Sequence, residues 1–586
     1  MKPLQYPLLI ALSILLAACG GKATTKDGDD FFVPATNDNV TKDPFDRARL
    51  LQISLKMPAN DFAKLRSEGR TLDTTLTDCP SSDFEYTDFK ASANIDGELI
   101  QEVAIRKKGY LGSLSRTRPS IKLNFDTHEE GRTFKTLKRM TLNNDRQDPS
   151  HTHQCLAYDL YRAAGLVAPR CNLAEVIINN ENMGVYTHVE SIKKPFLKRN
   201  YNNKSGNLYE AQIADFGSQL NQRFELKTNK TVNDRSDLDR LAAVLKLNDN
   251  DFIANIGQHI DVDEFITYWA VDTLIGHWDS ATGNTNNYYI YHNPEDNLFH
   301  FIPWGTDSAF TTDEILKPNS GPLFKNFSLA KRFYDIEQTR RLYFSEINRL
   351  LSEQWQEEAL LAKLEKVQQL TKAPHNAFED ITAFINGNEA TGQPSQRTLL
   401  NKAIAGEINQ IAYLIPDEAN DCSHIMNKTS LTAEFSSIGD KGSFSFTDAE
   451  GIDRTASMTL VSNYSSVDSL VYSLDARTLP PVAGLTFIGA ATPPSYLDSY
   501  VLQVFIEHTD YKKGRIPLQG LSTNLMLFKV IDKDAIPPKI ELISAGHSGT
   551  INLIEAGNGQ PGSVIEGRID AQMGLIKVRN YITTEY

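Results

Sequence analysis

The sequence GHWDSATGNTNNYY occupies residues 276–289, and IPWGTD follows at residues 302–307. These two segments supply two carboxylates, Asp279 and Asp307, together with several amide side chains. Apolar residues alternate on either side of residues 294–297, which predicts a hairpin between the segments. Neither packing nor solubility requires so many polar groups at the ends of apolar strands. We therefore take this region as the candidate site.

Two upstream blocks carry complementary charges. IRKKGYLGS (residues 105–113) and SIKLNF (residues 120–125) are typical of a strand, a turn of small residues and a second strand that contains Lys122. A lysine at that place could pair with a phosphate. VYTHVE (residues 185–190) is a predicted strand that ends in Glu190, a carboxylate that could hold such a lysine. The blocks together indicate a phosphate-binding site.

The sequence around these blocks mixes strands and helices. Within residues 48–230, the dipeptide Asp96-Gly97 is a strong hairpin signal, and a second hairpin is predicted around residues 179–182. The predicted strands of this region are residues 50–55, 84–95, 102–107, 120–125, 139–142, 173–178 and 184–190.

Helical periodicity marks three regions. A helix is predicted from Ser150, as its N-cap, to Ala164, where Gly165 ends it. Residues 235–278 and 329–414 also place apolar side chains near the 3.6-residue period.

Beyond about residue 421 the composition shifts to Ser, Thr, Gly and Val, and short strands follow at turn-like intervals, a pattern typical of a β-sandwich. We therefore expect an α+β fold, with a mixed sheet and a helical part, followed by an all-β, sandwich-like region. The predicted parts are a signal peptide (1–18), a flexible tether (19–46), the main domain (47–420) and a β-rich accessory region (421–586).

The N-terminus is typical of an export signal. A basic start precedes an apolar run from Leu8 to Ala18, which is too short to span a bilayer comfortably. The sequence LAAC, which ends at Cys19, resembles the lipobox of bacterial lipoproteins. This resemblance implies acylation of Cys19 and, with Gly20 after it, a lipid anchor at the outer membrane of a Gram-negative cell envelope. The alternative is an ordinary cleaved signal with an incidental cysteine.

The charge of the chain limits its partners. The net charge of −14 and the pI near 5.4 argue against nucleic acid, which requires concentrated Lys and Arg. No later segment approaches the ~18 uncharged apolar residues of a membrane-spanning helix. The expected partners are the membrane, through the lipid anchor, and a protein substrate or surface partner.

Four cysteines remain besides the one in the signal, and they are Cys79, Cys155, Cys171 and Cys422. An even number permits two disulfides in an oxidising compartment. We favour a Cys155–Cys171 pair, which would join the start of a helix to the strand after it. Free buried thiols are the alternative.

Three short motifs have better structural explanations than functional ones. GNGQPG (residues 557–562) fits a dinucleotide-binding pattern, but it lies between strand-like runs and opens no helix. Asp215-Phe216-Gly217 matches the magnesium-binding tripeptide of protein kinases, but no Gly-rich loop or His-Arg-Asp loop accompanies it. His151, His153 and Cys155 could form a metal cluster, yet their place at a helix start favours capping.

The ordered series of blocks resembles the spore-coat-protein-H (CotH) kinase-like family, from about residue 50 to 310 and on through the helices to about residue 415. The resemblance implies a remote protein-kinase-like core that binds ATP and Mg²⁺ and phosphorylates Ser or Thr of partner proteins. The anchors outside the candidate site are RKKG (106–109), KLNF (122–125), TLNN (141–144), DPS (148–150), AGLVAPR (164–170), MGVY (183–186), VE (189–190) and NLYE (207–210).

The resemblance also implies roles for individual residues in nucleotide binding and catalysis. Lys122 would pair with the phosphates, near Arg106, and Glu190 would hold Lys122 in place. Asp279 would orient the acceptor hydroxyl and take its proton.

The implied magnesium site includes one departure from the family pattern. Asp307 would hold the ion, with a neutral oxygen from Asn284 or Asn287. Better-known members have Asp directly after Pro-Trp, where this chain has Gly305. On an alternating strand Asp307 would point to the same side as residue 305 and could substitute for that aspartate. Otherwise the site is inactive.

Two functions from different classes follow. One is an atypical ATP- and Mg²⁺-dependent protein-kinase-like surface lipoprotein, which Asp279, Lys122 and Glu190 favour. The other is a catalytically inactive surface protein for binding, adhesion or assembly, which Gly305 and the scarcity of ATP outside the cytoplasm favour. A structural role, as a turn carboxylate or a solvated strand lysine, remains the alternative for Asp279 and Lys122.

Overall fold

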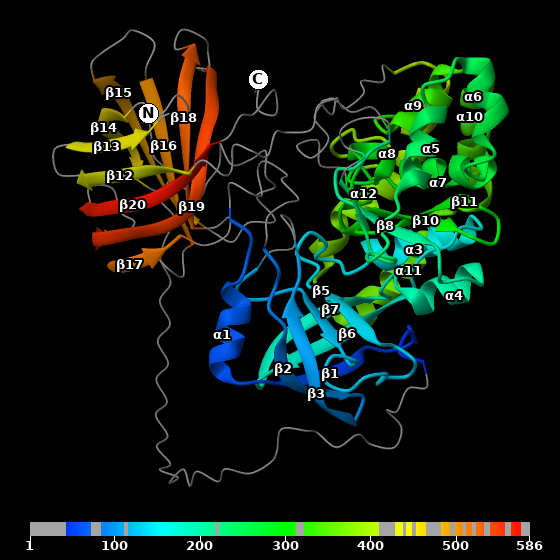
Figure 1. The fold of residues 1–586 in the computed structure, drawn as a ribbon, viewed down its shortest axis with the longest axis horizontal. Helices are drawn as coiled ribbons and strands as arrows, with labels where there is room; N and C mark the ends of the chain where they lie inside the picture. The colour runs from blue at the N-terminus through cyan, green and yellow to red at the C-terminus, as the bar shows by residue number, and fades with distance from the viewer. Residues whose placement is uncertain are drawn as a thin grey trace, which may run out of the picture.

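The computed structural model has the mixed α+β character that the sequence predicts (Figure 1). Its described strands form three sheets, and most of its described helices lie either within the second sheet in the sequence or between the second and the third. The residues that the structure describes are 43–71, 84–109, 115–216, 221, 223–311, 322–408, 428–436, 441–447, 453–463, 482–492, 499–507, 511–518, 523–532, 539–556 and 564–575.

The first sheet is a closed barrel of seven strands in the order β1-β2-β3-β4-β5-β7-β6. The parallel pair β1–β6 closes it. Alternate apolar residues such as Ile105, Leu123 and Met140 fill the interior and are fully buried. The elements are β1 (Leu51–Lys56), α1 (Ala59–Ser67), β2 (Phe89–Ile95), β3 (Glu98–Lys107), β4 (Ile121–Asn124), β5 (Arg139–Asn143), β6 (Cys171–Ile178) and β7 (Glu181–Val189).

Two tight turns confirm the predicted hairpins of this sheet. Asp96 and Gly97 join β2 to β3 with φ angles of 49° and 83°. Asn179 and Asn180 join β6 to β7 with φ angles of 51° and 68°. Two successive positive φ angles give a turn whose twist matches the flanking strands, and Asn, Asp and Gly tolerate that backbone conformation.

Helix α3 (His153–Ala163) is tied to β6 by a disulfide. Cys155 and Cys171 are bonded, with their Cα atoms 5.3 Å apart, which confirms the predicted pair. The metal-cluster interpretation therefore does not hold, since Cys155 is oxidised. His151 instead places Nδ1 2.8 Å from a carboxylate oxygen of Asp145.

The start of α3 differs from the prediction. Its N-cap is Thr152 and not Ser150. The carboxylate of Asp148 accepts a hydrogen bond from the main-chain nitrogen of His153 at 2.7 Å and another from that of Ser150 at 3.1 Å. A carboxylate from the preceding turn therefore satisfies the first amide of the helix. Gly165, with φ of 92°, follows the helix as predicted.

A second sheet has four antiparallel strands in the order β11-β10-β8-β9. β10 (Tyr288–Asn293) and β11 (Leu298–Pro303) form the predicted hairpin, and β8 (Asn207–Ala211) and β9 (Phe224–Leu226) extend it. Helix α4 (Lys194–Tyr201) packs against this sheet. The two candidate segments lie at one end of the hairpin, where β10 begins and β11 ends.

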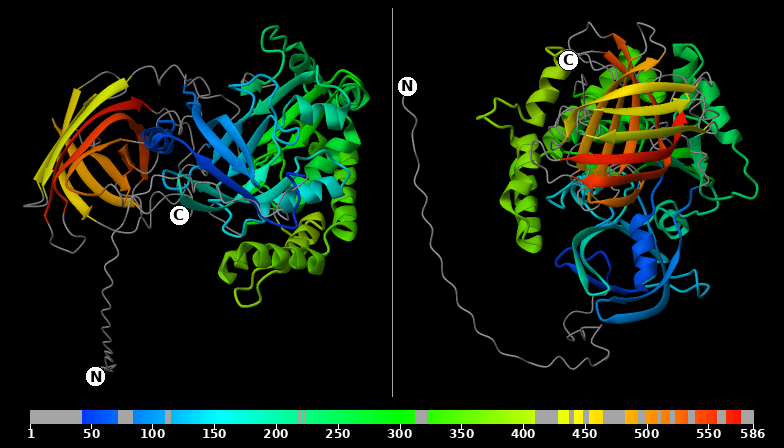
Figure 2. Two further views of the ribbon diagram at one scale, coloured as in Figure 1. Left: turned by 90° about the horizontal axis from the view of Figure 1, so that it is seen from below. Right: turned by 90° about the vertical axis from the view of Figure 1, so that its left-hand side faces the viewer.

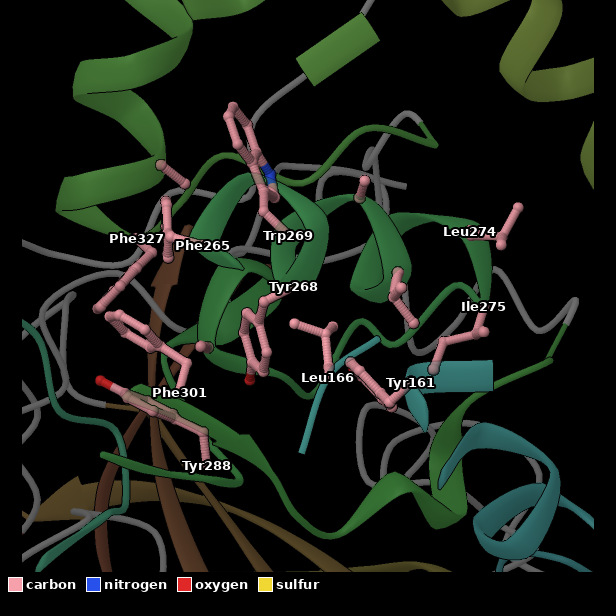
Figure 3. Close-up of a cluster of buried hydrophobic side chains, with 14 of the residues drawn as sticks. Tyr161, Leu166, Phe265, Tyr268, Trp269, Leu274, Ile275, Tyr288, Phe301 and Phe327 are labelled. Carbon is pink, nitrogen blue, oxygen red and sulfur yellow. The ribbon is translucent and has the colours of Figure 1, made fainter. Parts of the chain in front are cut away.

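Helix α7 (Val262–Leu274) is central to the buried core of the helical part (Figure 3). Trp269 stacks on Tyr343 with ring centroids 3.5 Å apart, and Phe265 and Tyr268 contact Phe301 of β11. This aromatic packing fixes the helix that leads into residue 276. The other helices are α5 (Ser236–Val244), α6 (Asp249–Ile256), α8 (Ala281–Asn284), α9 (Ser328–Asp335), α10 (Glu337–Glu353), α11 (Glu357–Thr371), α12 (Glu379–Asn386) and α13 (Gln396–Ile404).

The C-terminal region is all β, as predicted, but its strands form one sheet and not the two sheets of a sandwich (Figure 2). The order is β17-β19-β18-β16-β15-β14-β13-β12-β20, and β20 also pairs with β19, so the sheet closes on itself. The length of β19 allows this, because it pairs with both β18 and β20. The strands are β12 (Lys428–Ser436), β13 (Lys441–Thr447), β14 (Asp453–Asn463), β15 (Val482–Thr492), β16 (Ser499–Glu507), β17 (Gly514–Pro517), β18 (Asn524–Asp532), β19 (Lys539–Ala556) and β20 (Ile565–Leu575).

The tripeptide at residue 215 has the structural role that its context favours. The carboxylate of Asp215 accepts hydrogen bonds from the main-chain nitrogen and the hydroxyl of Ser328, the first residue of α9. Among the described residues, no helix is both long and apolar enough to cross a membrane. The predictions that lie outside the described residues concern Cys19, the tether, Cys79, Cys422 and the motif at 557–562.

Candidate functional site

Asp279 lies between α7 and α8, where three amide side chains surround its carboxylate. Asn284 and Asn286 donate to Oδ1 at 2.6 and 3.0 Å, and Asn287 donates to Oδ2 at 2.6 Å. The chain doubles back here with positive φ angles at Thr285 (60°) and Asn287 (48°). The polar residues of this segment therefore fix the orientation of Asp279.

The proton affinity of Asp279 is unusual for an aspartate. Burial raises its pKa to about 7, and the negative charge of Asp307 adds to the rise, although the three amide donors oppose it. The carboxylate can therefore take up and release a proton near neutral pH, as a general base must.

The amide oxygen of Asn284 has no partner. Its nitrogen donates to Asp279, while Oδ1 is buried and accepts no hydrogen bond from any described residue. The indole nitrogen of Trp278 in the same loop is also buried without an acceptor among those residues. Buried polar atoms without partners cost free energy and call for an explanation. An amide oxygen beside a carboxylate is a suitable ligand for a hard cation.

Asp307 does not reach the site along a strand, so the predicted alternation is wrong. β11 has ended, and Thr306–Ser308 form a turn of 3-10 helix. Gly305 has φ of 54°, and a Cβ there would lie 2.6 Å from Oδ1 of Asn287. The amide that binds Asp279 occupies the space that an aspartate at position 305 would need.

We expect Gly305→Ala to destabilise the protein more than Gly392→Ala does. Both glycines have positive φ, but nothing lies within 4 Å of a Cβ at 392. Backbone strain alone costs about 1–2 kcal/mol at either position. The clash at 305 should lower the free energy of unfolding by roughly a further 1 kcal/mol or more. Urea unfolding measures both losses, and equal losses would show that the contact with Asn287 relaxes freely.

Lys108, directly after β3, faces Asp307 across the site. Its ammonium donates to the side-chain oxygen of Asn143. Burial lowers the pKa of Lys108, although the charges of Asp307, Glu210 and Asp145 oppose this shift. Burial also disfavours the charged form of Asp307 and so raises its pKa, and the positive charge of Lys108 opposes that rise. The sequence reasoning assigned Lys108 no role, although this lysine lies in the quoted RKKG anchor.

Lys122 projects from the outer side of the barrel, because its two neighbours in β4 face the interior. It pairs with Arg106 in the β3–β4 register, and Arg106 lies 4.0 Å from Asp88. Burial lowers the pKa of Lys122 to about 7, and the charge of Glu210 opposes the shift. Lys122 is therefore not a simple solvated lysine.

The carboxylate opposite Lys122 is Glu210, on β8. Burial would raise the pKa of Glu210, but the charges of Lys227 and Lys122 outweigh burial and lower it to about 2. Lys227 lies 2.5 Å from the Glu210 carboxylate. Glu210 is therefore an ionised acid that orders the lysine side of the site.

Glu190 does not hold Lys122, so that prediction is wrong. Its carboxylate accepts hydrogen bonds from the guanidinium groups of Arg170 and Arg199, and from the main-chain nitrogen of Arg170 at 3.1 Å. Two guanidinium groups that each donate to both oxygens of a carboxylate leave it little capacity to bind a lysine as well. Glu210, the last residue of the quoted NLYE anchor, faces the lysine instead.

The site fits a hard cation that is bound together with phosphate. Across the described ranges, no group of three or more His, Cys, Asp or Glu side chains could hold a metal ion by itself. Asp307 and the Asn284 oxygen, which accepts no hydrogen bond from a described residue, could provide oxygen ligands, and Mg²⁺ at nucleotide sites uses one or two carboxylates together with phosphates and water. Lys108 and Lys122 supply the positive charge that phosphates require.

Comparisons with known proteins cover the segment that contains all of these side chains. Residues 105–399 match the model of the family described as CotH kinase protein. Inner spore coat protein H of Bacillus subtilis (strain 168) is 26% identical over 193 residues, which are 31% of this chain and 52% of that protein. The match thus spans about half the length of this relative. The Helicobacter pylori proinflammatory kinase CtkA superposes over 49% of this chain and 95% of its own, with a TM-score of 0.27 and 11% identity. Because the family model spans half of the sequence, the chain belongs to the CotH kinase protein family.

Proposed function

We propose that the protein is an atypical ATP- and Mg²⁺-dependent kinase that transfers a phosphoryl group to Ser or Thr of a partner protein. One observation carries the proposal: Lys108, Lys122, Glu210, Asp279 and Asp307 come together as a set of partly buried charges that act on one another. Such a set suits a kinase-like core, and membership of a family described as a kinase supports it.

The lysine side of the site would bind the nucleotide. Burial disfavours the charged forms of Lys108 and Lys122, so phosphate oxygens would supply the counter-charge that these lysines need. Glu210 would keep Lys122 oriented toward the phosphates. When bound, Mg²⁺ neutralises phosphate charge, and Asp307 with the Asn284 oxygen would hold it.

The aspartate side of the site would act on the acceptor. Phosphoryl transfer depends mostly on positioning and on neutralising charge. The amides fix Asp279 in one orientation, in which its carboxylate would accept the proton of a serine or threonine hydroxyl. A pKa of about 7 allows it to hold that proton during the transfer.

We expect MgATP to raise the unfolding temperature of the wild-type protein but not of Lys122→Met. Lys122 has a pKa of about 7 in the free protein, and bound phosphate would raise it. Binding above pH 7 would therefore take up a proton. The affinity for MgATP should then fall between about pH 7 and pH 9, by at most about tenfold per unit.

Thermal unfolding across this pH range measures the effect, with Lys246→Met as a control that removes an exposed lysine. Without nucleotide, the stability of the folded protein should change with pH in the opposite direction. Since the folded pKa of Lys122 lies below its ordinary value, the unfolded chain binds more protons between about pH 7 and pH 10.5, and stability rises with pH there. No shift of the wild type at millimolar MgATP would refute the kinase proposal.

We further propose that the protein is exported and lipid-anchored through Cys19 at the outer membrane of a Gram-negative cell envelope. The apolar run of residues 8–18 before LAAC supports export and acylation. The Cys155–Cys171 disulfide is consistent with an oxidising compartment. Mass spectrometry of the mature N-terminus tests the anchor, since an unmodified N-terminus would exclude it.

The contact between Gly305 and Asn287 favours a second function, that of a catalytically inactive surface protein for binding, adhesion or assembly. An aspartate directly after Trp304 would require the side chain of Asn287 to move. Thermal unfolding combined with radiolabel transfer from ATP separates the two functions. A rise in the unfolding temperature with MgATP, without any transfer of radiolabel, would favour the inactive binding protein.

A further inference from the structure

Strand β9, at the edge of the second sheet, forms one wall of a pocket of about 350 Å³. Arg223, Lys230 and Arg235 contribute positive charge to the lining, and Glu225 contributes a negative charge. None of the side chains of the site around Asp279 lines this pocket. The lining therefore has an excess of positive charge at a separate place on the sheet.

Glu225, the acidic residue of the pocket, already forms ion pairs with two lysines. The carboxylate of Glu225 lies 2.6 Å from the ammonium of Lys227 and 3.4 Å from that of Lys230. Lys227 also contacts Glu210, the residue opposite Glu225 in the β8–β9 register. Glu225 therefore leaves the arginines without a counter-charge.

Arg223 is the unusual residue of the pocket. It is only 8% exposed, and it forms no hydrogen bond or ion pair with any other residue that the structure describes. By contrast, Arg235 donates to the main-chain oxygen of Asn221 at 3.0 Å and lies over the ring of Tyr209. The residue as a whole is largely buried, but its guanidinium nitrogens remain accessible at the pocket, and their planar donors match the oxygens of a phosphate or a carboxylate.

We propose that this pocket binds an oxyanion, either a phosphate or a carboxylate group, with Arg223 as the bidentate ligand. Arg235 and Lys230 would add positive charge around the anion. A free ion and an acidic side chain of another polypeptide share this chemistry. The residues of this site do not overlap with those proposed to bind nucleotide at Lys122, although Lys227 joins Glu225 to Glu210.

Titration with inorganic phosphate, at constant ionic strength and without nucleotide, tests the site. We expect the unfolding temperature of the wild type to rise until the pocket is saturated. Arg223→Gln should weaken the phosphate affinity at least about tenfold, since it removes a charged bidentate contact. Lys246→Gln, which removes a charge from an exposed position, should not change the affinity. Lys122→Met should also keep the response, which separates this pocket from the nucleotide site.

The same variants give the outcomes that would overturn the proposal. One is an equal phosphate response in the wild type and in Arg223→Gln, and another is a response that only Lys122→Met abolishes. In phosphate-free buffer Arg223→Gln should unfold no earlier than the wild type, because it breaks no side-chain hydrogen bond or ion pair with a described residue. Marked destabilisation there would mean that Arg223 already has a partner. If Arg223→Gln does not fold, Arg223→Lys serves as the test variant. It keeps the positive charge but lacks the planar guanidinium, and it should therefore weaken phosphate binding.

Two peptides distinguish the sources of the anion. A glutamate peptide that binds more tightly than phosphate, but loses affinity in Arg223→Gln, would assign the pocket to an acidic polypeptide. A matched glutamine peptide should not bind. Binding of phosphate without the glutamate peptide would assign the pocket to a free ion, and binding of neither would refute the proposal.

Discussion

Asp279→Asn is expected to lower the rate of phosphoryl transfer by about 10²–10⁴-fold, the usual contribution of a general base. The substitution preserves the size of the side chain but removes the proton acceptor. It also places an amide against the donors of Asn284, Asn286 and Asn287, which now face a carboxylate. Incorporation of radiolabel from γ-labelled ATP into the protein itself and into dephosphorylated casein measures the loss.

The control for this experiment is Asp335→Asn, which removes a carboxylate that pairs with Lys331 on the surface. It should leave transfer unchanged. The MgATP-dependent rise in unfolding temperature should persist in Asp279→Asn, because the lysines would still bind the phosphates. Transfer that survives the loss of the Asp279 carboxylate would leave a nucleotide-binding protein with another mechanism.

Replacing Cys155 and Cys171 by alanine is expected to lower the free energy of unfolding by about 3 kcal/mol. The disulfide closes a loop with a sequence separation of 16 residues, and the entropy of the unfolded chain sets this magnitude. The effect should reach the site, because Nδ1 of His153 in α3 donates to the main-chain oxygen of Asp307 at 2.9 Å. Urea unfolding measures the stability, and the MgATP affinity reports on the site.

A reductant provides the internal comparison for the disulfide. The wild-type protein in dithiothreitol should approach the stability of the double-alanine variant, while the variant itself should not respond. A variant as stable as the oxidised wild type would show that packing alone positions α3.

Local sequence patterns were enough to predict much of the fold. Asp96-Gly97 and the pair of asparagines at residue 179 specify their turns through backbone conformations that few residues tolerate. The apolar side chains of residues 235–278 recur near the helical period, and α7 lies within that range. The pairing of β19 with β17, β18 and β20 was not predictable, because closure of a sheet depends on long-range register and not on local periodicity.

The candidate site was predicted in part. Asp279 and Asp307 stand out in the sequence because they lie beside apolar segments that do not need charged residues, and Lys122 because it lies within a predicted strand. The partner of Lys122 was misassigned, because Glu190 and Glu210 both end strands and only the three-dimensional structure shows that arginines occupy the first. Asp307 was placed by the wrong argument, since nothing in IPWGTD shows that the strand has ended before Gly305.

The contact between Gly305 and Asn287 has an evolutionary consequence. An aspartate in place of Gly305 would have to displace the amide of Asn287, which itself donates to Asp279. Removing that amide first would release one of the donors that orient Asp279. An aspartate at position 305 therefore requires a rearranged side chain at position 287. Lineages with either residue at position 305 should exchange it rarely, and only together with position 287.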